Sequence, residues 1–245
     1  MKYILLDIGN TETKIFYYHK KFLKKILIKS SLITEKKLKT KLGFIIKKKI
    51  KINYVICCSV VPKLTKKISN FFYKTLKLKI KEIKTFELEK FIKIKINKKQ
   101  VGSDRIANAI AVNHKKNHIV IDFGTATTFD VIIRNQYYGG LISPGINLSL
   151  ETLFLKASLI NPISLKKIKT VVGKNTKNAV RSGFFWGYIG LINKIIELII
   201  KKNKKNFKII LTGGLAHLFQ NSLDYKVEVN KELTMFGLLK IAENE

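Results

Sequence analysis

The chain has 245 residues, 46% of them hydrophobic and few of them Gly or Pro, so it can form one large or two small domains and is not a disordered chain. Its net charge of +32 is typical of nucleic-acid or anionic-membrane binding, yet only three of its 48 basic residues are Arg and the Lys residues are scattered from Lys2 to Lys240. A chain-wide excess of Lys, Ile and Asn favours compositional drift, and predicts only weak, salt-sensitive attraction to polyanions.

The first half of the chain is expected to alternate strands and helices. After a strand and a second β-rich run at 13–18, the patterns predict helices at 36–48, 64–76 and 103–113 and strands at 54–59 and 77–83. Ser103 is expected to cap the N-terminus of the third helix, with Asp104 in its first turn. In the second half the patterns predict strands at 127–133, 137–142, 207–211 and 226–229 and helices at 147–156, 175–202, 215–219 and from 234. The overall pattern indicates a mixed α/β fold.

An internal repeat opens each half. Residues 3–14 (YILLDIGNTETK) resemble residues 118–129 (HIVIDFGTATTF): an apolar strand, Asp, one apolar residue, Gly and a hydroxyl-rich turn. A second β-rich run follows each copy, which predicts the same strand–turn–strand hairpin twice. We therefore expect two similar domains that face each other, at residues 1–114 and 115–245.

The helix expected at 175–202 carries a stripe of small residues. Ala179, Gly183, Gly187 and Gly190 fall on one face. Because each Gly costs a helix about 1 kcal/mol relative to Ala, the stripe indicates that something packs closely there. The sequence leaves open whether this is packing within the chain or a contact between domains or subunits.

The cysteines and apolar runs indicate a cytoplasmic protein. Cys57 and Cys58 are adjacent, so they cannot form a disulfide framework and are interpreted as core residues in a reducing compartment. Asp7 interrupts the first apolar run, so no signal peptide is visible. The late apolar run at 189–200 contains Asn, Lys and Glu, which favours a buried amphipathic helix over a membrane span.

Both hairpin turns carry residues suited to phosphate. In the first, Gly9 lets backbone N–H groups approach an anion, Lys14 can reach phosphate oxygens, and Asp7 can hold a metal ion. A single copy also fits an ordinary turn. The second copy, at 122–128, favours a nucleotide whose phosphates lie in a cleft between domains. Glycine-rich turns at 139–145 and 212–214 add further points of close backbone approach.

The segment Gly102-Ser103-Asp104-Arg105 lies between the two repeats. An ionised Asp at a helix N-terminus can accept a hydroxyl proton during transfer from ATP. Arg105 could bind a substrate carboxylate through two parallel hydrogen bonds, which Lys cannot do. Taken alone, the segment is better explained by a capping Asp and a surface Arg.

In this order and at this length, the motifs Asp-x-Gly-Asn-Thr, Gly-x-Asp-Arg, Asp-x-Gly-Thr-Ala-Thr-Thr, Gly-Gly-x-Ile-x-Pro-Gly and Thr-Gly-Gly resemble type III pantothenate kinase from Asp7 to Gly214. The resemblance implies two similar actin-like ATPase (ribonuclease H-like) α/β domains with a nucleotide cleft between them. It implies ATP-dependent phosphorylation of pantothenate to 4′-phosphopantothenate, the first step toward coenzyme A. It further implies Mg²⁺ with the ATP, a potassium or ammonium ion, and a homodimer. The scattered charge and the amphipathic late helix favour no specific nucleic-acid partner and no membrane partner.

The resemblance also assigns residues. Asp104 would be the general base, and Asp122 would hold the monovalent cation. ATP would be bound by Asp7, Ile8, Gly9, Asn10, Thr11, Glu12, Thr13, Lys14 and Thr125. Pantothenate would be bound by Gly102, Ser103, Asp104, Arg105 and Thr176.

One departure from the family pattern keeps alternatives open. Lys95 and Lys98 stand where the family usually has a Tyr and a Pro before Gly-x-Asp-Arg. The missing Tyr would suit another small-molecule kinase of the same fold. The high charge would suit a non-catalytic regulatory or nucleic-acid-binding protein on this fold, although the joint presence of Asp7, Asp104, Arg105 and Asp122 speaks against it.

Overall fold

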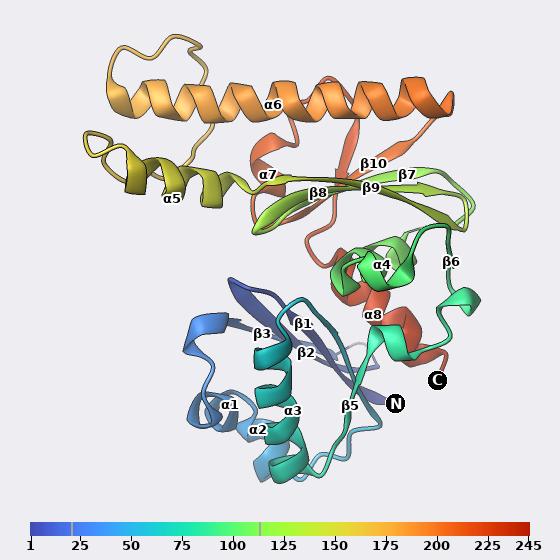
Figure 1. Cartoon of the computed structure of the whole chain (residues 1–245). Helices are drawn as coiled ribbons and strands as arrows, with labels where there is room; N and C mark the ends of the chain where they lie inside the picture. The colour runs from blue at the N-terminus through green and yellow to red at the C-terminus, as the bar shows by residue number, and fades with distance from the viewer. Residues whose placement is uncertain (21, 113) are drawn as a thin grey trace. The chain divides into compact units, whose positions relative to one another are not determined.

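A computed structural model describes residues 1–20, 22–112 and 114–245, which form two compact units (Figure 1). The first unit comprises Met1–Val112 together with Leu233–Glu245, and the second comprises Asn113–Glu232. The division expected after residue 114 lies two residues from the first boundary. The C-terminal helix α8 (Leu233–Glu243), expected in the second domain, packs instead on α4, β1 and β4 of the first unit.

The first unit is built on a five-stranded sheet in the order β3-β2-β1-β4-β5. Strand β2 runs antiparallel to β1 and β3, and β4 and β5 run parallel to β1. The strands are β1 (Lys2–Ile8), β2 (Glu12–His19), β3 (Phe22–Lys29), β4 (Tyr54–Ser59) and β5 (Ile80–Glu82). The expected hairpin and the strand at 54–59 are confirmed. Strand β3 was not predicted, because its three Lys residues obscure the apolar alternation.

Helices cover this sheet. Beyond α8 they are α1 (Glu35–Lys41), α2 (Gly43–Lys47), α3 (Pro62–Leu76) and α4 (Ser103–Ala111). The unit also contains the short 3₁₀ turns η1 (Ser30–Leu32), η2 (Ile83–Thr85), η3 (Leu88–Lys90) and η4 (Lys98–Gln100), and the two-residue strand β6 (Lys93–Ile94). The single helix expected at 36–48 is two helices that meet at Leu42. The helix expected to reach Asn113, a residue outside the described ranges, ends at Ala111.

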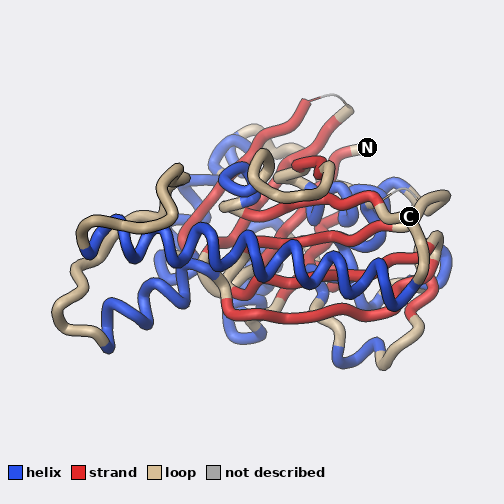
Figure 2. The backbone as a smooth tube through the Cα atoms, turned by 90° about the horizontal axis from the view of Figure 1, so that it is seen from above, coloured by secondary structure: helices blue, strands red, loops and turns tan. Residues whose placement is uncertain are grey.

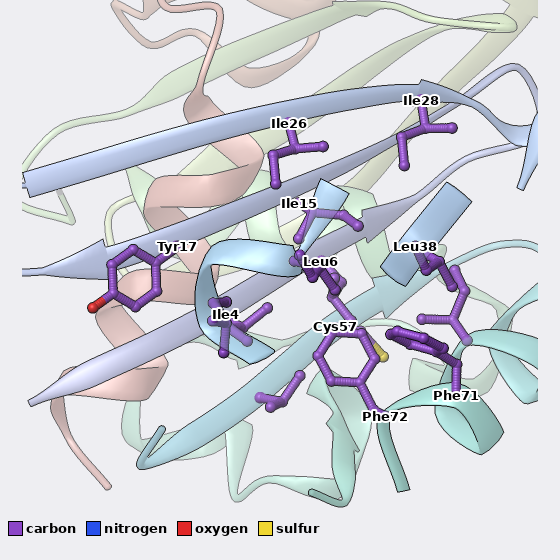
Figure 3. Packing of buried hydrophobic residues seen from close by; sticks show 14 of the residues in the cluster. Ile4, Leu6, Ile15, Tyr17, Ile26, Ile28, Leu38, Cys57, Phe71 and Phe72 are labelled. Carbon is purple, nitrogen blue, oxygen red and sulfur yellow. The ribbon is translucent and has the colours of Figure 1, made fainter. Parts of the chain in front are cut away.

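One face of the first sheet forms a dense core with α1 and α3. Figure 3 shows strand residues such as Ile4, Leu6 and Ile15 pointing toward Leu38 and Phe72 from the helices, and all five are fully buried. Strands β1 and β4 are nearly continuous apolar runs because both of their faces are covered. This burial makes the ends of β1 and β4 rigid supports for the polar residues that follow them.

The second unit repeats the same topology. Its strands lie in the order β9-β8-β7-β10-β11, which corresponds strand for strand to β3-β2-β1-β4-β5. They are β7 (His118–Phe123), β8 (Ala126–Ile133), β9 (Gln136–Pro144), β10 (Lys208–Gly213) and β11 (Val227–Val229). Strands β7, β10 and β11 are parallel, and β8 is antiparallel to β7 and β9. The hairpin predicted from the internal repeat is confirmed in this unit as well.

Helices α5 (Ile146–Lys156), α6 (Thr176–Asn203) and α7 (Ala216–Phe219) complete the second unit, and Figure 2 shows α6 lying over its sheet. Helix α6 is long and apolar enough to cross a membrane by composition, with a hydropathy of 1.4 in its most apolar window. One face of α6, including Phe185 and Ile192, is buried in the core. Only 28% of that apolar window is buried, however, so the helix is less covered than expected.

Candidate active site

In each unit the candidate residues other than Thr176 gather at one edge of the sheet. Parallel strands end at the same edge, and antiparallel neighbours begin there. In the first unit β1, β4 and β5 end at Ile8, Ser59 and Glu82, and the β1–β2 turn follows Ile8. In the second unit β7 and β10 end at Phe123 and Gly213, and the β7–β8 turn lies beside them.

Asp7 is held from both sides on β1. Its sheet neighbours are Lys14 on β2 and Cys58 on β4. The Lys14 ammonium nitrogen lies 3.5 Å from Oδ2 of Asp7, and the Cys58 thiol donates to Oδ1 at 3.6 Å. The Asp7 side chain is only 17% exposed. Each carboxylate oxygen therefore has its own partner, so the group has a defined orientation.

The surroundings of Asp7 shift its acidity. Burial raises the pKa of Asp7, the Lys14 ammonium opposes that rise, and the Asp104 carboxylate adds to it. Burial also raises the pKa of Cys58 well above its ordinary value, so the thiol stays protonated and acts as a donor. The influence of Asp104 on the pKa of Asp7 indicates that two expected site residues, from β1 and α4, lie in one electrostatic environment.

Asp104 occupies the first turn of α4, as expected, but the cap is different. The prediction that Ser103 caps the helix is wrong: Gly102 is the N-cap residue, and the Ser103 hydroxyl donates to Glu82 at the end of β5. The Asp104 carboxylate folds back to accept the N–H of Arg105 at 2.8 Å. A Cβ on Gly102 would meet that carboxylate, which would have to move from this position. Glu82 thus ties the start of α4 to the sheet, a role that the sequence did not reveal.

Helix α8 holds the other end of α4. The Lys240 ammonium donates to the carbonyl oxygens of Ile110, Ala111 and Val112 at 3.0, 2.8 and 3.2 Å, which satisfies the free carbonyl groups at the helix C-terminus. The Thr234 hydroxyl donates to the buried Asn108 at 2.8 Å. Asp104 therefore sits on a helix that is fixed at both ends.

Asp122 lies at the corresponding edge of the second unit, between Thr128 on β8 and Thr212 on β10. Gly213 beside it has φ +85°, and a Cβ there would lie 2.6 Å from both Oδ1 of Asp122 and the Phe123 carbonyl oxygen. The absence of a side chain at this position leaves room in which a carboxylate and a carbonyl oxygen converge. Oxygen donors of this kind suit a hard cation.

The two turns differ in length, and this changes the correspondence between them. Ile8 pairs with Thr13 across a four-residue connection, whereas Phe123 pairs with Thr127 across three residues. In the structure the counterpart of Lys14 is therefore Thr128, because these residues pair with Asp7 and Asp122 respectively. Only the first of the two aspartates has an ammonium group at that paired position.

Thr176 lies in a different part of the second unit. It is the first residue of α6, and Asn175 caps that helix by accepting the Asn178 N–H at 2.9 Å. Thr176 and Arg181 line an open depression of about 690 Å³ with the 159–164 segment. None of the residues of the 122–125 turn lines this depression. The structure thus separates Thr176 from the Asp122 edge of its own unit.

The structure also shows where other residues discussed from the sequence lie. Lys95 follows β6 and is exposed, and Lys98 begins η4. Cys57 and Cys58 are buried free thiols, as interpreted from the sequence. Within the described ranges, no group of three or more His, Cys, Asp or Glu side chains is arranged to hold a metal ion.

Comparison with known proteins gives consistent results. Residues 3–198 match the type III pantothenate kinase family. The chain is 52% identical over 241 residues to the type III pantothenate kinase of Pelagibacter ubique, and the match covers 97% of each chain.

Solved structures show the fold. A Sinorhizobium meliloti protein described as a 2-dehydro-3-deoxygalactonokinase superposes with a TM-score of 0.62 at 12% identity, over 99% of this chain and 96% of that one. The ethanolamine utilization protein EutJ from Carboxydothermus hydrogenoformans gives a TM-score of 0.57 at 14% identity, over 97% and 89%. The two mixed sheets of repeated topology are those of the actin-like ATPase fold, as expected.

Proposed function

This chain belongs to the type III pantothenate kinase family, and from that membership we propose how its residues transfer the γ-phosphoryl group of ATP to pantothenate. The reaction yields 4′-phosphopantothenate, the first step of coenzyme A biosynthesis. The observation that carries the proposal is the joint placement of Asp7, Lys14 and Asp104 at one edge of the first unit.

ATP is proposed to be bound by Asp7, Ile8, Gly9, Asn10, Thr11, Glu12, Thr13 and Lys14 of the first turn, and by Thr125. Gly9 permits close backbone approach, and the Lys14 ammonium supplies positive charge. The ion pair with Asp7 supports this assignment, because it holds the ammonium group at the end of the strand rather than free in solvent.

Asp104 is proposed to be the general base. As the pantothenate hydroxyl oxygen bonds to the γ-phosphorus and the bond to ADP breaks, the hydroxyl proton passes to the Asp104 carboxylate. The fixed start of α4 supports this role, because a base must be held within hydrogen-bond reach of its proton. Gly102, Ser103, Arg105 and Thr176 complete the proposed pantothenate site, with Arg105 binding the substrate carboxylate.

Two cations are proposed to assist. The carboxylates of Asp7 and Asp104 fit a divalent cation, and with ATP bound Asp7 and the phosphates would hold Mg²⁺. Its chemistry is to neutralise phosphate charge. Asp122 and the oxygen atoms near Gly213 fit a potassium or ammonium ion.

The enzyme is proposed to be a homodimer that pairs through α6. A Cβ added at Gly183, Gly187 or Gly190 would meet no described atom within 4 Å, so packing within the chain does not explain the stripe. Nearby apolar side chains on the helix, such as Leu198 at 51%, are exposed. A second copy would cover them, and we accordingly interpret α6 as both a core helix and an interface helix. We also propose that the enzyme is cytoplasmic and has no specific nucleic-acid partner.

The direct test is ATP-dependent phosphorylation by the purified chain, measured with pantothenate and with a panel of other small hydroxyl compounds. We expect pantothenate to be preferred despite Lys95. A substitution of Lys95 by Tyr should lower KM for pantothenate if the family Tyr contact can be restored. Faster turnover of another hydroxyl compound by the unmodified chain would instead support a different kinase of the same fold.

A further inference from the structure

Ser30 lies directly after β3, at the same edge as the β1–β2 turn, and it is only 9% exposed. The sequence pattern around Ser30 did not indicate a site, because β3 itself was not predicted. Strand β3 is the outer strand of the sheet, and its end brings Ser30 against Gly9, Thr11 and Thr13.

Three hydrogen bonds join Ser30 to that turn. Its backbone N–H donates to the carbonyl oxygen of Thr11 at 2.9 Å, and its hydroxyl donates to the carbonyl oxygen of Gly9 at 2.6 Å. The hydroxyl oxygens of Ser30 and Thr13 lie 3.0 Å apart. A serine hydroxyl has one proton, which is directed to Gly9, so Thr13 must be the donor in the last bond.

The resulting chain of bonds runs from the Thr13 hydroxyl through Ser30 to Gly9. Thr13 is fully buried, so its hydroxyl serves this chain and holds the turn. A buried hydrogen-bonded chain of this kind fixes local geometry, because each group left without its partner would incur a desolvation cost.

The orientation of one peptide group follows from this chain. In a planar trans peptide the C=O and the following N–H point in opposite directions. With the Gly9 carbonyl drawn toward Ser30, the N–H of Asn10 points away from Ser30, and Asn10 is exposed. An outward backbone N–H next to a glycine is the donor that a phosphate oxygen needs.

We propose that Ser30 is a positioning residue for nucleotide binding: through its hydroxyl it holds the Gly9–Asn10 peptide in the orientation that receives a phosphate of ATP. The proposal rests on the assignment of ATP to the 7–14 turn made above. Ser30 itself does not touch the nucleotide.

The test compares Ser30→Ala with Ser31→Ala, a matched control because Ser31 is the adjacent residue and is exposed. Steady-state kinetics with ATP and pantothenate varied separately should show KM for ATP raised about tenfold in Ser30→Ala. We expect kcat and KM for pantothenate to stay within about twofold, since uniform loss of binding raises KM alone. Ser31→Ala should match the unmodified enzyme, and Ser30→Thr, which keeps the hydroxyl, should recover ATP binding.

An unchanged KM for ATP in a folded Ser30→Ala enzyme overturns the proposal, as does Ser30→Thr being as impaired as Ser30→Ala. If Ser30→Ala does not fold, Ser30→Cys takes its place, because a thiol is a much weaker donor to the Gly9 carbonyl oxygen than a hydroxyl. A folded Ser30→Cys enzyme with an unchanged KM for ATP then overturns the proposal.

Lys14→Ala separates this inference from the proposed ATP site. If Lys14→Ala raises KM for ATP and Ser30→Ala does not, only the role of Ser30 fails. If neither changes it, the assignment of ATP to the turn fails as well.

Discussion

Gly237 on α8 lies directly against the carbonyl oxygen of Ala107 on α4, so closely that a Cβ at Gly237 would overlap that oxygen. This contact brings the backbones of the two helices together and, with Lys240, fixes the helix that carries Asp104. The last helix of the chain thereby supports a candidate catalytic residue more than a hundred positions earlier in the sequence.

Gly237→Ala should therefore destabilise the first unit. The added methyl group meets backbone, which cannot move aside as a flexible side chain can, so we expect a loss of about 1–3 kcal/mol in the free energy of unfolding. Urea denaturation measures it. Gly43→Ala is the control, since a Cβ there meets no described atom within 4 Å. Equal stability of the two variants would show that α4 and α8 can separate without cost.

Asp122→Ala should weaken activation by monovalent cations. We expect turnover to require potassium or ammonium in addition to magnesium, and the variant to need a higher potassium concentration for half-maximal rate because an oxygen ligand is lost. Initial rates are measured across a potassium series at constant ionic strength. Full activity of the unmodified enzyme in sodium-only buffer would count against a cation site at Asp122.

Gly187→Leu should disrupt the proposed dimer. The new side chain projects from the open stripe of α6, where it meets no described atom of its own chain within 4 Å, so folding should survive. Light scattering after size exclusion should give the mass of one chain for this variant and of two for the unmodified protein. Gly43→Leu is the matched control, and a dimeric Gly187→Leu protein would move the interface elsewhere.

His118 should make the protein sensitive to mild acid. Burial lowers the pKa of His118 to about 4, and no described group accepts or donates at Nδ1. Between pH 6.5 and 4 the unfolded chain binds a proton here and the folded chain does not, so stability is present above that window and falls as the pH drops through it. His118→Gln should flatten this part of the stability curve, measured by urea denaturation across pH. Parallel curves for the two proteins would contradict this role.

The features that could be predicted from the sequence are those that depend on residues close together in the chain. The hairpins at Asp7 and Asp122 follow from a local pattern of apolar residues, Gly and hydroxyls, and the structure contains both. Hydrogen bonds between residues far apart in the sequence could not be predicted. Serine is a common helix-capping residue, but the Ser103 hydroxyl donates a hydrogen bond to Glu82, which lies 21 positions earlier in the sequence. Ser30 gains its role only because β3 joins the sheet.

Asp104→Asn gives the most direct test of the catalytic assignment. Proton removal by a positioned carboxylate contributes roughly 10²–10⁴-fold, so we expect kcat to fall at least about a hundredfold. The amide oxygen can still accept the Arg105 N–H, and α4 remains anchored through Ser103, so the fold should survive. Thermal melting and nucleotide binding, measured alongside the rates, should change little.

Arg105→Lys is the companion variant because it should fail differently. Lys keeps the positive charge but lacks the planar group that binds a carboxylate with two hydrogen bonds, so the main loss should appear in KM for pantothenate. A folded Asp104→Asn enzyme with near-normal kcat would remove Asp104 as the base and leave positioning and electrostatics to drive the transfer. Loss of folding in Asp104→Asn would instead show that the carboxylate serves the start of α4, because its charge favours the positive end of the helix dipole.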